Sequence, residues 1–274
     1  MNPGFELEIK DKIADIKLNR PEKKNALAPE FWKRFPECVA ELADKGTIRA
    51  IILSAAGADF CSGMDLSVFA GNDKLSTDSA YERERLYHLV KHIQAAVSAI
   101  ENSRIPVIAA IQGRCLGAGL DLVSACDLRY ATEDAVFRIE ETNIGIMADL
   151  GSLQRLPGIL PTAIVKEMAF TGSSLKADRA LETGFLNGVA KDMDSLNKSV
   201  LKVAESIAEK PPLVVSGSKL SINYAREHSI EDSLDNAALR QSQIFDSKEI
   251  MQFIQCKKSN QPHPTDLKET SREL

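Results

Sequence analysis

The sequence lacks the features that mark several large classes of protein. Its 274 residues carry five scattered cysteines with no paired spacing, so a disulfide framework is not expected. No apolar run approaches the roughly 18 residues that a membrane-spanning helix needs. The formal net charge of −5 argues against nucleic acid or an anionic membrane as the main partner. The first residues resemble no targeting signal, and we expect a cytoplasmic protein with reduced thiols.

Metal and dinucleotide sites are also missing from the pattern. Of four histidines, only His88 and His92 share a helical spacing, and their polar surroundings predict a solvated pair rather than a zinc site. The glycine-rich stretch 117–119 offers only the first half of a dinucleotide fingerprint. We therefore expect neither a metal nor a separate cofactor.

What is present is material for one large core and an alternating order of elements. Apolar residues make up 44% of the chain, which fits a single sizeable globular domain. The periodicity predicts strands at 5–9, 13–18, 50–54, 105–111, 128–131 and 135–139, and helices from Pro29 and over 81–103. Strands that alternate with helices imply an α/β fold with a parallel sheet.

The last third changes character. Helices are predicted at 161–170, 176–181, 195–208, 213–226, 230–247 and 248–258, with breaks at Gly184 and Pro211–Pro212. We expect a core over 1–200, a helical oligomerisation region over 201–258 and a flexible tail over 259–274. The polar segment 66–79 is expected to be a loop over the substrate.

The most informative stretch runs from 105 to 149. A buried strand leads through a glycine-rich turn into a helix, whose first amides have no partner within the helix and can stabilise negative charge. Asp121 falls in the first turn of that helix. Glu141 and Asp149 lie on either side of an apolar, glycine-containing loop. Glu140 stands beside Glu141, and only one of the two can face a pocket if the segment is extended.

Four segments together resemble the crotonase superfamily, also called the enoyl-CoA hydratase/isomerase family. They are CLGAGLDLVSACDLRYATEDAVF (115–137), LNRPEKKNAL (18–27), FCSGMDL (60–66) and LGSLQRLP (150–157). The resemblance implies a spiral of ββα units with a C-terminal helical trimerisation region, and a homohexamer built as a dimer of trimers. It implies an acyl-CoA substrate, a role in fatty acid beta-oxidation, and coenzyme A bound as part of that substrate.

The resemblance also implies site residues. The backbone amides of Ser62 and Ala118 would form an oxyanion hole for the thioester oxygen, and Asp121, Glu141 and Asp149 would be catalytic. Residues expected to contact the substrate or its coenzyme A part are Lys24, Ala26, Cys61, Ser62, Gly63, Met64, Asp65, Ala118 and Gly119. A nucleophilic role for Ser62 is disfavoured, because no evident activating base is near it in sequence.

The three acids favour one reaction within the family. Enoyl-CoA hydratases carry a glycine at the position of Asp149, whereas a third acid resembles the Δ3,5-Δ2,4-dienoyl-CoA isomerases. A 1,5-shift removes a proton at C2 and delivers one at C6, for which we expect Asp149 as base, Glu141 as donor and Asp121 as a polar assistant. Two alternatives stay open: hydration of 2-enoyl-CoA by Asp121 and Glu141, and a non-enzymatic binding role, which the acidic charge disfavours.

Overall fold

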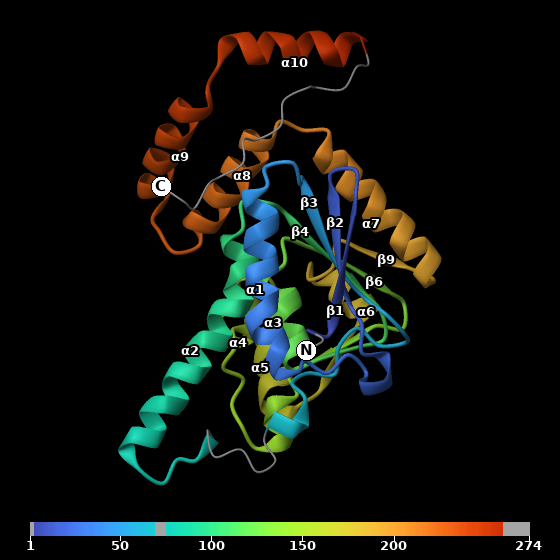
Figure 1. Ribbon diagram of the computed structural model, residues 1–274, viewed down its shortest axis with the longest axis vertical. Helices are drawn as coiled ribbons and strands as arrows, with labels where there is room; N and C mark the ends of the chain where they lie inside the picture. Colours follow the sequence, from blue (N-terminus) through green and yellow to red (C-terminus); the bar gives the residue numbers. More distant parts are fainter. Residues whose placement is uncertain (1–2, 69–74, 260–274) are drawn as a thin grey trace.

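A six-stranded sheet forms the centre of the computed structural model, which describes residues 3–68 and 75–259 (Figure 1). Its order is β1-β2-β3-β4-β6-β9. The hairpin of β1 and β2 is antiparallel and every other neighbouring pair is parallel. The expected α/β fold with a parallel sheet is thus confirmed. The strands are β1 (Phe5–Lys10), β2 (Ile13–Leu18), β3 (Ala50–Ala55), β4 (Val107–Ile111), β6 (Leu128–Thr132) and β9 (Gly188–Ala190).

A smaller sheet lies beside the first, in the order β5-β7-β8. Its strands are β5 (Arg114–Leu116), β7 (Val136–Arg138) and β8 (Ser174–Lys176). A parallel bridge between Cys61 and Cys115 joins β5 to the loop after β3. The two sheets thus bring the loop after β3 and the turn after β5 together.

Helices cover both faces of the larger sheet, and β3 and β4 are accordingly buried along their whole length. The helices are α1 (Pro29–Asp44), α2 (Ala80–Asn102), α3 (Ala118–Ala125), α4 (Ser152–Arg155), α5 (Thr162–Thr171), α6 (Ala177–Glu182), α7 (Met193–Ala208), α8 (Pro212–Ala225), α9 (Ile230–Ile244) and α10 (Ser247–Ser259). Short 3-10 turns are η1 (Pro21–Lys23), η2 (Leu66–Val68), η4 (Glu141–Ile144) and η5 (Leu156–Gly158). The predicted helices are all present, with ends that differ from the prediction by at most three residues.

The predicted domain boundary at residue 200 falls inside α7. Leu196, Val200 and Ala204 of that helix are buried against Ile52 and Ile108 of the sheet. The helix therefore belongs to the core. The helices that project from the body are α9 and α10, which lie at one end of the molecule (Figure 1) and contain no buried residue. Of the expected tail over 259–274, Ser259 is the last residue of α10, and residues 260–274 lie outside the described residues, as do residues 69–74 of the expected substrate loop.

Candidate active site

The turn between β5 and α3 sets the position of the first acid. Gly117, at φ 50° and ψ −123°, precedes the first helical residue, a backbone conformation that L side chains rarely adopt. A Cβ at this position would lie 3.0 Å from Oε1 of Glu141. Glycine is therefore required at position 117 for two reasons: the backbone angles and the close approach of the Glu141 side chain.

Asp121 is fully buried in the first turn of α3. Its Oδ1 accepts a hydrogen bond from the backbone N–H of Ser152 at 2.6 Å, whereas its buried Oδ2 has no hydrogen-bond partner. Burial raises the pKa of Asp121 to about 6, and the negative charge of Asp149 adds to the rise while the Ser152 hydrogen bond opposes it. The helix terminus alone would favour ionisation, so burial decides the outcome.

Glu141 begins η4 and also carries a buried oxygen, Oε2, without a hydrogen-bond partner. Burial raises its pKa to about 7, and repulsion from Asp121 and Asp149 adds to that rise. The neighbouring Glu140 turns away and pairs with Arg138. The selection of Glu141 over Glu140 thus agrees with the structure, although the backbone here is a helical turn rather than the extended segment expected.

Asp149 stands at the other end of the loop, half-buried, where burial raises its pKa. Gln94 of α2 donates from Nε2 to its backbone carbonyl at 2.6 Å. The three acids predicted from sequence therefore form one electrostatically coupled cluster. Three carboxyl groups in such a cluster cannot all ionise near neutral pH, so protonated and ionised members coexist.

Of the two amides predicted to form the oxyanion hole, that of Ser62 in the loop after β3 already has a hydrogen-bond partner within the protein. The Ser62 amide donates to the carbonyl of Lys24 at 3.0 Å and is not free to bind a ligand. Leu27 pairs with both neighbours of Met64: its N–H donates to Gly63 at 2.9 Å and its carbonyl accepts from Asp65 at 3.0 Å. This bridge leaves the N–H of Met64 pointing away from Leu27.

The Met64 amide therefore replaces Ser62 as the candidate partner of Ala118. A Cβ built on the adjoining Gly63 would lie 3.9 Å from the amide nitrogen of Ala118, so the two segments are neighbours. Ala118 is the first residue of α3, where an amide has no partner within the helix. Within residues 3–68 and 75–259, no hydrogen bond from either amide to the protein is found.

The remaining predicted contact residues fall into two groups. Lys24 is exposed and Ala26 half-buried on the loop that runs beside residues 61–65, and Arg20 ties the two segments by donating to the carbonyl of Ala26 at 2.6 Å and to Asp65 at 2.9 Å. Cys61, by contrast, is fully buried, and burial raises the pKa of its thiol to about 12. A Cβ on Gly119 would meet Cys61 Cβ at 2.7 Å. Cys61 and Gly119 therefore pack against each other beneath the loop 61–65 rather than at the surface.

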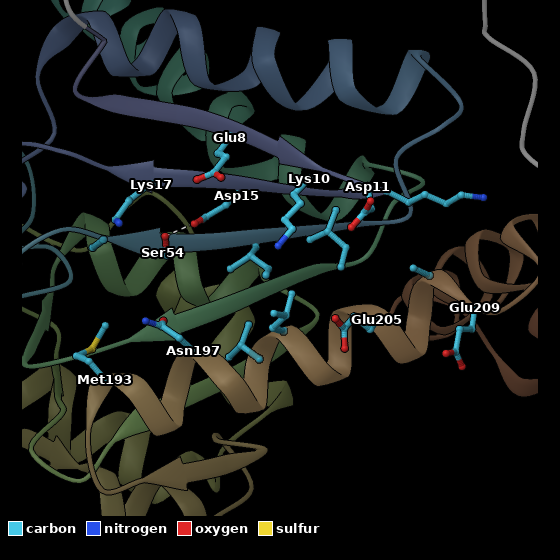
Figure 2. Close-up of a pocket in the computed structure, with 17 residues that line it drawn as sticks. Glu8, Lys10, Asp11, Asp15, Lys17, Ser54, Met193, Asn197, Glu205 and Glu209 are labelled. Atoms are coloured by element: carbon cyan, nitrogen blue, oxygen red, sulfur yellow. Dashed lines mark hydrogen bonds between the residues drawn. The ribbon is translucent and has the colours of Figure 1, made fainter.

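A groove on the other face of the sheet contains none of these residues. It has a volume of about 660 Å³ and lies between β1–β3 and α7, with Asp15 and Ser54 joined by a 2.6 Å hydrogen bond on its wall (Figure 2). Both Ser54 and the neighbouring Ile52 line this groove, whereas α3 packs into the larger cluster on the opposite side. The groove is therefore separate from the acid cluster.

A largely parallel sheet flanked by helices, with an amide free at the start of α3 and three coupled carboxyl groups, defines an α/β enzyme of the acid–base type. The chain belongs to the enoyl-CoA hydratase/isomerase family, whose sequence profile it matches over residues 8–261. The structure agrees: the enoyl-CoA hydratase of Bacillus anthracis superposes with a TM-score of 0.85 at 27% identity, covering 98% of this chain and 100% of that one.

Two curated relatives share the greater part of the chain. The peroxisomal Δ(3,5)-Δ(2,4)-dienoyl-CoA isomerase of Arabidopsis thaliana is 40% identical over 240 residues, covering 86% of each protein. The mitochondrial Δ(3,5)-Δ(2,4)-dienoyl-CoA isomerase of Mus musculus is 38% identical over 246 residues, covering 89% of this chain and 75% of the relative. None of the described helices is long and apolar enough to cross a membrane.

Several residues that shape the site escaped the sequence analysis. They are Arg20, which donates to the carbonyl of Ala26, Gln94, which donates to the carbonyl of Asp149, and Arg155, which donates to the carbonyl of Leu150 in the turn after it. Arg155 lies in the quoted segment LGSLQRLP but carried no assigned role. Gln94 gave no signal at all, because its partner lies 55 residues away in sequence.

Proposed function

We propose that this enzyme converts 3,5-dienoyl-CoA to 2,4-dienoyl-CoA in the beta-oxidation of unsaturated acyl chains. The observation that carries the proposal is the third carboxyl group, Asp149, coupled electrostatically to Asp121 and Glu141. The relatives that bear the name dienoyl-CoA isomerase, at 38% and 40% identity, support it. A 1,5-shift needs acid–base groups at both ends of the diene, and the cluster supplies them.

The proton balance assigns a role to each acid. Asp149 takes a proton from C2, the electron pair moves into the diene and onto the thioester oxygen, and Glu141 delivers its proton to C6. Glu141, whose pKa is raised to about 7 by burial, is protonated in part of the molecules near neutral pH and is suited to donate. Asp121 interacts with both other acids and is suited to share the proton that must return from Asp149 to Glu141 after each turnover.

The dienolate needs an oxyanion site, and the amides of Ala118 and Met64 are our candidates. A main-chain donor is fixed in place before the reaction begins, so it stabilises the developing charge without reorganisation. Removing one donor of this kind costs roughly 10²–10³ in turnover in other enzymes. The coenzyme A part would lie along the loop 20–27, with Lys24 as a phosphate contact.

The assembly and compartment extend the proposal. We propose a homohexamer of two trimers, because α9 and α10 expose apolar side chains such as Leu234 and Met251 that a neighbouring chain can cover. Cytoplasmic localisation stays a prediction, since the relatives named above are described as peroxisomal and mitochondrial.

Product analysis tests the proposed reaction directly. The purified protein is given 3,5-dienoyl-CoA and 2-enoyl-CoA in separate reactions, and the products are separated by chromatography. We expect the conjugated 2,4-diene from the first substrate and little 3-hydroxyacyl-CoA from the second. Hydration of 2-enoyl-CoA is the alternative that the buried Asp121–Glu141 pair favours, and rapid hydration with no diene shift would establish it instead.

A further inference from the structure

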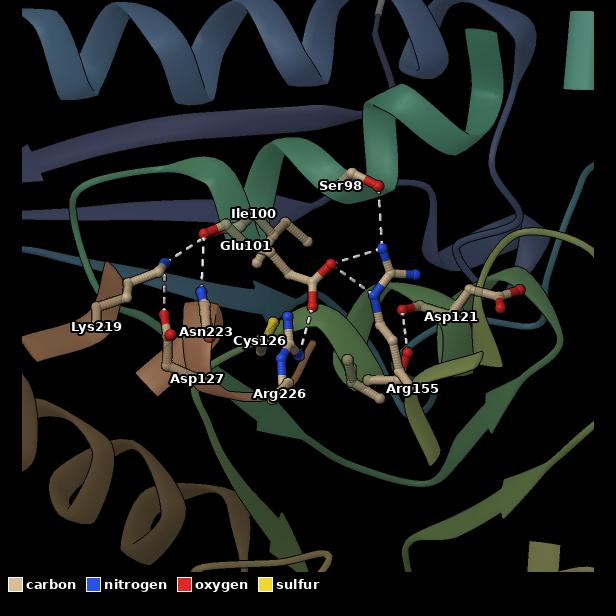
Figure 3. A network of polar contacts seen from close by, with 12 residues as sticks. Ser98, Ile100, Glu101, Asp121, Cys126, Asp127, Arg155, Lys219, Asn223 and Arg226 are labelled. Atoms are coloured by element: carbon tan, nitrogen blue, oxygen red, sulfur yellow. Dashed lines mark hydrogen bonds and ion pairs between the residues drawn. The ribbon is translucent and has the colours of Figure 1, made fainter. Parts of the chain in front are cut away.

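Helix α2 presents a polar stripe to the segment that carries Asp149. Gln94, Ser98 and Glu101 are spaced four and three residues apart, so they share one face of the helix. Gln94 holds the carbonyl of Asp149, as described above. Ser98 and Glu101 both accept from the guanidinium of Arg155, at 3.0 and 2.8 Å (Figure 3). The side chains of this stripe therefore hydrogen-bond to both ends of the Asp149–Arg155 segment.

Arg155 connects the polar stripe of α2 to the acid cluster through its contacts with the turn after Asp149. Its Nη1 donates to the carbonyl of Leu150 at 3.2 Å. The guanidinium also lies against Gly151, where a Cβ would stand 1.6 Å from Nη1 and φ is +131°. The next residue, Ser152, donates its amide to Asp121. The short turn from Asp149 to Ser152 is thus pressed between Arg155 and the helix that carries Asp121.

Glu101 is the point at which this arrangement meets the C-terminal helices. Its second oxygen accepts from Arg226, just after α8, at 2.8 Å, and its backbone carbonyl accepts from Asn223 at 3.2 Å. The carboxylates and guanidinium at the centre are largely shielded, with side-chain exposures of 11% for Arg155 and 15% for Glu101. A cavity of about 900 Å³ lies between α2, α8 and the turn, and Asp149 is among the residues that line it.

We propose that Glu101 is a positioning residue of the acid cluster: by holding Arg155 it fixes the Asp149–Ser152 turn, and with it the placement of Asp149 and Asp121. The proposal rests on the proposed isomerase function for its catalytic consequence, though not for its geometry. In this arrangement Glu101 touches no substrate and acts only through Arg155. Its loss should lower turnover while leaving the binding of the coenzyme A ester nearly unchanged.

The same contacts give an electrostatic signature that a merely structural ion pair would not produce. The positive charge of Arg155 lowers the pKa of Asp121, against the larger effect of burial, and the carboxylate of Glu101 neutralises part of that charge. The titratable and charged groups that face Asp121 are Cys115 from β5, Glu141 from η4, Asp149 from the turn and Arg155 from α4. Removing the charge of Glu101 should lower the pKa of Asp121, and removing that of Arg155 should raise it.

The test compares three variants of the full-length protein. Glu101→Gln keeps the shape and removes the charge, Arg155→Met removes the partner charge, and Lys219→Met is the matched control. Lys219 of α8 is also buried at the seam with α2, where it pairs with Asp127 at 2.8 Å. Its other hydrogen bonds within the described residues go to the carbonyls of Ile100 and Ile105, not to Arg155. Each variant is assayed with 3,5-dienoyl-CoA, and its melting temperature is measured.

We expect Glu101→Gln to lose about tenfold in kcat with KM changed less than twofold. The titration midpoint of Asp121, followed by carbon NMR of carboxyl-labelled protein without substrate, should fall by about half a unit in Glu101→Gln and rise in Arg155→Met. Lys219→Met should lower the melting temperature at least as much while leaving the midpoint unchanged. An unchanged midpoint and an unchanged kcat in a folded Glu101→Gln protein would overturn the proposal.

The NMR titration separates this inference from the proposed reaction. If the wild-type protein fails to convert dienoyl-CoA, the isomerase function is refuted. The opposite shifts of the Asp121 midpoint in the two variants would still support the positioning role. If the wild-type protein is active and neither kcat nor the midpoint changes in a folded Glu101→Gln protein, the positioning role alone is refuted.

Discussion

Two groups of largely buried carboxylates in this molecule differ in whether their oxygens have partners. At the seam of α2 and α8, Glu101 is bound by two arginines and Asp127 by Lys219. Burial alone would raise the pKa of Glu101, but its bonds to Arg155 and Arg226 hold that pKa below its ordinary value. At Asp127 burial raises the pKa, and the pairing with Lys219 opposes that rise. In the acid cluster, Asp121 and Glu141 each keep one buried oxygen with no partner, and their pKa values rise to about 6 and 7.

The difference teaches where the fold has been shaped for chemistry. Native proteins pair nearly all of their buried polar atoms, and this chain does so at the seam. An unpaired carboxyl oxygen in the interior is costly unless the group stays protonated. The acid cluster therefore lowers the folding stability of the protein but keeps protonated carboxyl groups available. The ion pairs at the seam, in contrast, fix the positions of α2 and α8.

The largest expected effect comes from Glu141→Gln, which should separate activity from stability. Turnover should fall roughly 10²–10⁴-fold, because the proton donor is lost. The folded-state pKa of Glu141 is raised from 4.5 to about 7, so the folded protein holds a proton that the unfolded chain releases between these values. Its ionisation thus lowers stability as pH rises from about 4.5 to 7. The variant should be more stable than wild type by up to about 3 kcal/mol at pH 8 and equal to it at pH 4.

The seam provides the contrasting control. Asp127→Asn leaves the buried ammonium of Lys219 without its counter-charge, and should destabilise the protein by about 3 kcal/mol at pH 8 with kcat nearly unchanged. Denaturant unfolding at the two pH values measures both. If Glu141→Gln were as destabilising as Asp127→Asn, the contrast between cluster and seam would be false.

A second change tests how tightly the cluster is built. Gly117→Ala should lower kcat about 10- to 100-fold, because its Cβ would displace Glu141 and its backbone angles would cost roughly 1–3 kcal/mol. Gly158→Ala is the control, since a Cβ there meets no atom within 4 Å and its φ is ordinary. Steady-state kinetics and melting temperatures of both variants decide the matter, and wild-type kcat in the first would show that the glycine is dispensable.

Assembly should respond to a single charge on α9. Leu234, which is 65% exposed, is replaced by Asp, and the exposed Gln243 of the same helix by Glu as the control. We expect sedimentation velocity to show a hexamer for wild type and for Gln243→Glu, and smaller species for Leu234→Asp. A wild-type protein that sediments as a single chain at micromolar concentration would refute the proposed assembly.

The smallest effect is expected at the coenzyme A loop. Lys24→Glu should raise KM about three- to tenfold at low ionic strength, with kcat unchanged and the difference shrinking in added salt. Lys202→Glu makes the same charge change on the exposed side of α7, across the sheet, and should leave KM unaltered. Equal KM values for the two variants would remove Lys24 from the binding site.

Sequence reasoning recovered what local patterns encode. Alternating apolar residues gave the β1–β2 hairpin, and glycine before a helical pattern gave the start of α3. The identities of Asp121, Glu141 and Asp149 followed from segments that resemble the family. The coupling of these three acids was expected from their chemistry, and the structure shows it.

The parts that failed depend on contacts distant in sequence. Which amide of the loop after β3 is free depends on its pairing with Leu27 and Lys24, and this pairing places the candidate donor at Met64, two residues after Ser62. The boundary expected at residue 200 falls inside α7, whose apolar face packs against the sheet. The hydrogen bonds that Gln94 and Glu101 make to the Asp149–Arg155 segment join residues more than 50 positions apart. Such contacts produce no local pattern in the sequence.

The central claim is that Asp149 makes this cluster an isomerase site, and paired kinetics of Asp149→Asn and Glu141→Gln test it most directly. Both variants are assayed with 3,5-dienoyl-CoA and with 2-enoyl-CoA at pH 7. Our account predicts that Asp149→Asn loses roughly 10²–10⁴ in dienoyl isomerisation with little change in KM, and that Glu141→Gln loses at least as much. Near-wild-type isomerase turnover in the Asp149→Asn protein would contradict the account.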